Sequence, residues 1–116
     1  MPRFLAVYMM GGENVARFRA LPKADQDTID AKGVAQWTEW ESRNAAHFPD
    51  RGGMVGKTLR VSAAGTAPAS NAICGYLTVE APSIEDAARL FENHPHFNVF
   101  PGDSVDIMPF VTEAPA

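Results

Sequence analysis

Two histidines and an aspartate near the C-terminal end are the residues best suited to acid-base chemistry. His94 and His96 flank Pro95, and Asp106 lies in an alternating segment that follows them. Histidine has the unperturbed side-chain pKa nearest neutrality, so either imidazole can act as a general acid or base. We therefore predict a catalytic set of His96 and His94, with Asp106 orienting an imidazole. The alternative is structural: His94 interacts with the C-terminal end of a preceding helix, and His96 caps a loop.

The same histidines can also be interpreted as metal ligands. Together with His47 or Asp103 they supply the nitrogen and oxygen atoms that zinc and similar ions bind. However, two histidines separated by one proline do not form a recognised ligand signature. The sequence therefore predicts no metal and no cofactor, and the metal site stays an alternative.

Three further residues have the chemistry to hold a ligand. Arg60 offers paired planar donors, and Tyr8 and Tyr76 offer stacking surfaces, so we expect them to bind a small anionic or aromatic molecule. The alternative is an ion pair between Arg60 and Asp106 across a dimer interface, with the tyrosines as packing. Glu41 falls beside the apolar stripe of the first long helix, where it lines a pocket or edges a solvated face.

The elements that position these residues follow from periodicity and from helix signals. Alternation or continuous apolar runs predict strands at 3–10, 56–62, 75–79 and 104–108. Helical spacing predicts one helix over 25–46 and a second that begins after Ser83 and ends near Asn93, because Pro95 disfavours helical geometry at His94. Residues 94–97 are then a loop, and residues 63–71 are a hairpin connection.

This order, β-α-β-β-α-β, predicts an α+β ferredoxin-like sandwich in which two helices cover one face of a four-stranded antiparallel sheet. Period-two alternation separates the two faces of that sheet. We expect the helices to cover Leu5, Val7, Leu77, Val79, Val105 and Ile107. We expect the open face to hold Phe4, Ala6, Tyr8, Tyr76, Thr78, Ser104, Asp106 and Met108, joined by Thr58, Arg60 and Ser62. Two such faces would meet in a homodimer around a partly polar cavity.

Composition limits the classes of partner. The 116 residues, 46% of them apolar, fit one domain over 1–112 with a frayed tail at 113–116. A net charge of −4 without a basic run argues against nucleic acid and anionic membranes. The single cysteine, Cys74, indicates a reducing compartment. No bilayer-spanning run and no evident signal peptide are present, so we expect a cytoplasmic protein.

Several of these segments together resemble the YCII-related family of small ferredoxin-like proteins. The resemblance covers nearly the whole chain: the opening strand, the helix with Trp37 and Trp40, Val55-Gly56-Lys57-Thr58, residues 71–79, His94-Pro95-His96 and Val105-Asp106-Ile107-Met108. It implies a dimeric α+β barrel and a small-molecule enzyme that uses a His–Asp pair in the barrel cleft.

We therefore expect a homodimeric enzyme that transfers a proton, with His96 as acid or base. The alternative is a non-catalytic module that binds a small ligand or serves as a structural dimerisation partner, since one fold hosts many unrelated sites.

Overall fold

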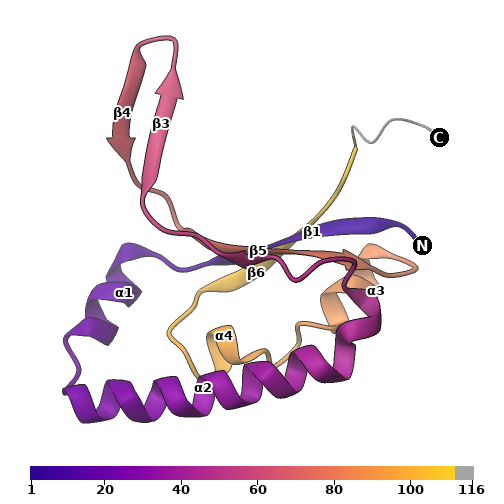
Figure 1. The fold of residues 1–116 in the computed structure, drawn as a ribbon, viewed down its shortest axis with the longest axis horizontal. Helices are drawn as coiled ribbons and strands as arrows, with labels where there is room; N and C mark the ends of the chain where they lie inside the picture. Colours follow the sequence, from indigo (N-terminus) through magenta and orange to yellow (C-terminus); the bar gives the residue numbers. More distant parts are fainter. Residues whose placement is uncertain (112–116) are drawn as a thin grey trace.

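A computed structural model of the chain describes residues 1–111, so the expected frayed tail lies outside the described part. Figure 1 shows a sheet with the helices gathered on one side of it. The elements are β1 (Arg3–Met9), α1 (Gly12–Arg19), α2 (Lys23–Asn44), the 3₁₀ turn η1 (Ala45–His47), β2 (Gly53–Met54), β3 (Thr58–Ser62), β4 (Gly65–Ala69), β5 (Ile73–Glu80), α3 (Ile84–Arg89), α4 (Pro95–Asn98) and β6 (Ser104–Pro109).

The main sheet has four strands in the order β2-β5-β1-β6, and every neighbouring pair is antiparallel. The expected α+β class with a four-stranded antiparallel sheet is confirmed. All the helices lie on one face, and the opposite face carries no helix (Figure 1). This uncovered surface is called the open face below. Within residues 1–111, no helix is both long and apolar enough to cross a bilayer.

The prediction for the second strand of the sheet was wrong. Thr58–Ser62 pairs only with Gly65–Ala69, and the two form a separate hairpin that leaves the main sheet. The strand that fills the expected place is β2, in which Gly53 pairs with Tyr76 and Met54 pairs with Gly75. Two residues in a glycine-rich segment give no strand periodicity, whereas the hairpin alternates in sequence without joining the sheet.

The direction of the side chains on β1 was also predicted wrongly. Ala6 lies directly opposite Leu77 on β5 and Ile107 on β6, and residues opposite each other share a face. Leu77 and Ile107 pack in the core under the helices as expected, so Ala6 does too, together with Phe4 and Tyr8. The run in β1 is apolar on both faces, and period two alone therefore does not mark its buried side.

Two contacts fix α2 against the rest of the fold. The indole Nε1 of Trp40 donates a hydrogen bond of 2.7 Å to the carbonyl oxygen of Leu90. Gly33 is buried against the ring of Phe100, and a Cβ at Gly33 would collide with that ring. The helix that follows β5 begins as predicted, because the Ser83 hydroxyl accepts a 3.1 Å hydrogen bond from the Asp86 N–H.

Candidate functional site

The histidine motif forms a helical turn, and the prediction of a loop at 94–97 was wrong. His94 caps α4: its Nδ1 accepts a 2.9 Å hydrogen bond from the His96 N–H. Pro95 takes the first helical position, where its missing N–H costs nothing. The turn carries both imidazoles into the interior, with 0% of His94 and 1% of His96 exposed.

The hydrogen bonds fix where each neutral ring carries its proton. Because Nδ1 of His94 accepts, its Nε2 holds the proton, and this atom lies 3.4 Å from the hydroxyl oxygen of Tyr8. His94 therefore donates to Tyr8. Nε2 of His96 lies 2.8 Å from the carbonyl oxygen of Met9, which only accepts, so His96 donates there.

Burial keeps both imidazoles uncharged at neutral pH. It lowers the pKa of His94 to about 3, and the neighbouring His96 contributes in the same direction. Burial also lowers the pKa of His96, against the opposing effects of the Met9 carbonyl and the Asp103 carboxylate. Neither ring reaches the surface, so the pair is suited to holding other groups in place rather than exchanging protons with a substrate.

Tyr8 is the group that this pair holds. Its ring centroid lies 5.0 Å from that of Trp37, 5.3 Å from His94 and 5.2 Å from His96. Burial raises the pKa of the Tyr8 hydroxyl, and the nearby carboxylate of Glu41 adds to the increase. Tyr8 therefore stays a neutral phenol and a hydrogen-bond donor.

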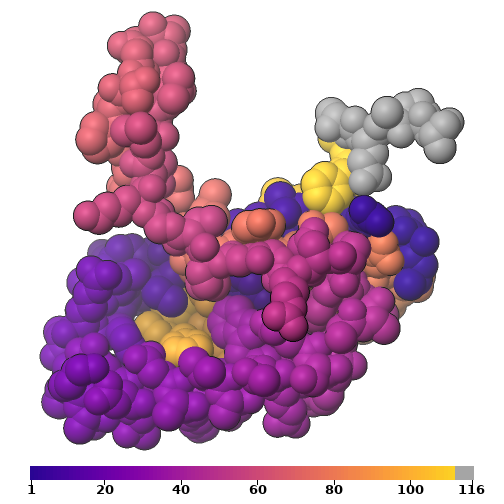
Figure 2. Space-filling model, in the orientation of Figure 1, coloured from indigo at the N-terminus to yellow at the C-terminus, as the bar shows by residue number. Residues whose placement is uncertain are grey.

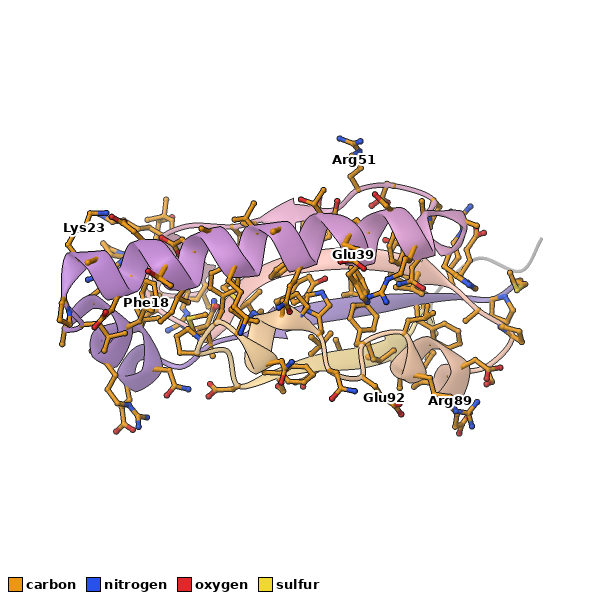
Figure 3. All side chains as sticks on the ribbon, turned by 90° about the horizontal axis from the view of Figure 1, so that it is seen from below. Phe18, Lys23, Glu39, Arg51, Arg89 and Glu92 are labelled. Carbon is orange, nitrogen blue, oxygen red and sulfur yellow. The ribbon has the colours of Figure 1, made fainter. Side chains whose placement is uncertain are left out.

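A pocket of about 440 Å³ opens beside Tyr8, between α2 and the edge formed by β2 and β5. This volume is within the range of small-molecule sites, roughly 300 to 1,000 Å³. Figure 3 shows the Arg51 side chain extending away from the body of the protein. The lining residues are Tyr8, Trp37, Thr38, Glu41, Ser42, Ala45, Phe48, Asp50, Arg51, Gly53, Met54, Tyr76 and Leu77.

The six residues predicted for the site divide into two groups. His94, His96 and Tyr8 come together under the helices. Asp106 lies opposite Val7 on the open face, where its Oδ1 accepts a 2.9 Å hydrogen bond from Ser104.

Asp106 therefore does not orient either imidazole of its own chain, because the sheet separates them. Tyr76 faces the open side and also borders the pocket. Arg60 lies on the β3–β4 hairpin, away from the tyrosines, so the predicted grouping of Arg60 with Tyr8 and Tyr76 does not form within one chain.

The third ligand considered for a metal, His47, is engaged elsewhere. Its Nδ1 lies 2.9 Å from the carbonyl oxygen of Glu80. Among residues 1–111, no three histidine, cysteine or acidic side chains are grouped so as to hold a metal ion.

Three charged residues line the pocket, Glu41, Asp50 and Arg51, and none of them belongs to the predicted set of site residues. The position of Glu41 gave a partial indication that it lines a pocket, since this residue lies beside the apolar stripe of α2. Asp50 gave none, because nothing local indicates that the loop after η1 folds back over α2. No protein-family model matches this chain, and no curated protein is significantly similar to it.

Proposed function

We propose that this chain is a small-molecule enzyme that transfers a proton in the pocket beside α2. Tyr8 donates a hydrogen bond to an oxygen of the substrate, and Glu41 accepts the proton. The observation that carries the proposal is the bond from the buried, neutral His94 to the hydroxyl oxygen of Tyr8, a residue that lines the pocket. Tyr8 and Glu41 therefore take the place of His96, which was expected from the sequence to act as the acid or base.

The bond from His94 determines what Tyr8 can offer. A phenol has one proton and an oxygen that accepts, and the His94 N–H already occupies the accepting side. The phenolic proton is therefore free to point to a ligand in the pocket. In a site of low dielectric such a fixed donor stabilises negative charge that develops on a substrate oxygen.

Glu41 supplies the complementary group. Glu41 and Tyr8 line the same pocket, and the Glu41 charge contributes to the raised pKa of the Tyr8 hydroxyl. In the proposed step a C–H bond beside a substrate carbonyl breaks, and its proton passes to Glu41. The electron pair forms an enolate whose oxygen accepts from Tyr8. Where a C=C bond of the substrate is conjugated with this enolate, return of the proton at the far carbon of that bond gives an isomer. The step needs no oxidant and no cofactor.

The pocket walls favour a flat and partly apolar substrate. Trp37, Phe48 and Leu77 supply aromatic and aliphatic surface. The aromatic ligand expected from the sequence fits these walls. The charged lining residues are Glu41, Asp50 and Arg51, two acidic and one basic, and Arg60 is remote. Because the Arg51 side chain extends away from the body (Figure 3), we propose an uncharged rather than an anionic ligand.

We further propose that the chain is a cytoplasmic member of the YCII-related family with a ferredoxin-like fold. The order β2-β5-β1-β6 supports this, because β1, α2, β2, β5, α3 and β6 then form the β-α-β-β-α-β series, with β3 and β4 as an inserted hairpin. The uncovered face of the sheet supports the proposed homodimer.

Deuterium exchange tests the enzymatic proposal. The purified protein is incubated in D₂O with a panel of small cyclic ketones and lactones, including β,γ-unsaturated ones, and loss of C–H signals is followed by proton NMR. We expect exchange well above the buffer rate for at least one compound. Glu41→Gln should reduce that rate by about 100-fold or more. Glu39→Gln, which changes a neighbouring glutamate outside this pocket, should leave it unchanged.

The alternative is a non-catalytic module that binds a small ligand. It is favoured by the hydrogen bonding inside the protein: every buried side-chain nitrogen or oxygen of residues 1–111 already has at least one hydrogen-bond partner. Compounds that shift the Trp37 indole resonance but show no exchange above the buffer rate would support this module and overturn the enzyme.

A further inference from the structure

The β3–β4 hairpin stands away from the rest of the molecule. Figure 1 shows it rising from the side of the sheet opposite the helices, and Figure 2 shows it standing clear of the body. The radius of gyration is 16.0 Å, against about 13 Å for a compact domain of this length. We call residues 55–71 the arm.

The arm has an apolar face without cover. Leu59 and Val61 are 65% and 77% exposed. Their partners in the register are Pro68 and Thr66, so these four side chains share one face of the hairpin. An isolated two-stranded hairpin is at best marginally stable in water. A contact with another chain would therefore stabilise the arm, and its exposed apolar face provides a surface for such a contact.

The open face offers a second uncovered apolar surface on the same side of the molecule. Tyr76 is 44% exposed and Met108 is 42% exposed. Leu5 lies directly opposite Met108 and shares this face. Exposed apolar surface gathered on one side is typical of an interaction site.

The charges of the two surfaces are complementary. The arm contains Lys57 and Arg60 and no acidic residue, so its net charge is +2. Because the net charge of the whole chain is −4, the residues outside the arm carry a net charge of −6. Asp106 lies exposed on the open face. Arg60 forms no ion pair among the described residues, and it lies on the hairpin face opposite Leu59 and Val61, so its charge attracts an acidic second copy without entering the apolar contact. A positive arm on an otherwise acidic chain fits a second copy of the same chain.

We propose that the arm of each chain docks its Leu59 and Val61 face on the open face of a second copy. Both surfaces lie on the same side of the molecule, so a single two-fold axis allows each copy to give its arm and receive the other. The inference deepens the proposed homodimer and does not depend on the proposed proton transfer. Tyr76 borders both the open face and the pocket, whereas Tyr8 and Glu41 lie on the helix side of the sheet.

Sedimentation velocity on matched variants tests the arm. The wild-type protein should sediment as a dimer of about 25 kDa, twice the chain mass of 12.6 kDa. Leu59→Asp/Val61→Asp should sediment as a monomer with an unchanged far-ultraviolet spectrum. Thr58→Asp/Ser62→Asp adds the same charge on the other face of the hairpin, so it cancels the +2 of the arm but leaves Leu59 and Val61 intact. It should bind its partner more weakly than the wild-type protein and still sediment as a dimer at 100 μM.

Mixing two variant chains tests whether the arm of one copy docks on the open face of the other. Met108→Asp damages the receiving face and should also give monomers. A mixture of Met108→Asp with Leu59→Asp/Val61→Asp retains one intact arm and one intact face, so it should form a dimer more than tenfold tighter than either variant alone.

The proposal is overturned if the wild-type protein is monomeric at 100 μM, if the arm variant remains dimeric, or if the mixture stays monomeric. Deuterium exchange in the same samples separates this result from the enzymatic proposal. A monomeric arm variant that exchanges at the wild-type rate supports both. A dimer that depends on the arm but exchanges no compound supports the arm and overturns only the enzyme.

Discussion

The hydroxyl oxygen of Tyr8 and Nε2 of His94 lie 3.4 Å apart in the buried layer between the sheet and α2. The bond joins β1, near the start of the chain, to the cap of α4, near its end. The His96 N–H holds the other nitrogen of the same ring. The donor at the pocket wall is therefore positioned by a helix cap rather than by a catalytic partner.

Tyr8 should resist ionisation. Burial and the Glu41 carboxylate raise the pKa of its hydroxyl well above the ordinary value of 10. In an ultraviolet titration at 295 nm of the folded protein, a fraction of the tyrosine absorbance should stay un-ionised at pH 11. That fraction should disappear in Tyr8→Phe. Full ionisation of the wild-type tyrosines by pH 11 before unfolding would contradict the burial of this hydroxyl.

The same substitution should weaken the fold. Tyr8→Phe leaves the Nε2 proton of His94 buried without an acceptor, which costs about 1 to 2 kcal/mol in the free energy of unfolding. Urea denaturation at pH 7.5 measures this loss. Tyr76→Phe, which changes a half-exposed tyrosine on the open face, is the control and should lose far less.

Stability should fall as the pH falls below about 6.5. The pKa of His94 is about 3 in the folded protein and near its ordinary 6.5 when unfolded, so between these values the unfolded chain binds the extra proton. Between pH 7.5 and 5.5, His94 alone should remove about 1.4 kcal/mol from the free energy of unfolding. His96 acts in the same direction, because burial also lowers its pKa.

Two histidine variants separate this effect from other titrations. His94→Gln should lower the slope of stability against pH, measured by urea denaturation at several pH values. His47→Gln removes a histidine of η1 that lies outside the buried pair, and the slope of this variant is the background against which that of His94→Gln is compared. Equal slopes for the wild-type protein and His94→Gln would refute the burial of a neutral His94.

Gly33 should not tolerate a side chain despite its place within a helix. Alanine has the better helix propensity by about 1 kcal/mol. A Cβ at this position collides with the Phe100 ring, and overpacking of a core contact costs about 1 to 3 kcal/mol. Gly33→Ala should therefore lower the thermal unfolding midpoint. Gly12→Ala in α1, where a Cβ meets no atom within 4 Å, is the control. A higher midpoint for Gly33→Ala would contradict the contact with Phe100.

Much of the fold could be predicted from local sequence. The cap at Ser83, the long α2 and the strands β1, β5 and β6 each have a strong local cause in capping or periodicity. Which face of β1 is buried under the helices could not be predicted, because both faces of this strand are apolar. The short strand β2 exists only through its pairing with Tyr76 and Gly75, which is a tertiary effect.

The residues of the candidate site could be predicted in part, and their chemical roles less well. His94, His96 and Tyr8 were expected to act, and they do meet. Whether a histidine is a base or a support depends on burial and on its hydrogen-bond partners, neither of which a motif contains. Pro95 was read as a helix stop, although it also suits the first position of the next helix.

The most direct test of the account is the rate of deuterium exchange in Tyr8→Phe, measured beside the wild-type protein with a compound that the wild-type protein exchanges. We predict a rate at least about 100-fold lower, because the phenylalanine keeps the ring but lacks the proton that stabilises the enolate oxygen. The compound's dissociation constant should change much less. Exchange by Tyr8→Phe at the wild-type rate would contradict the role of Tyr8, and with it the proposed site.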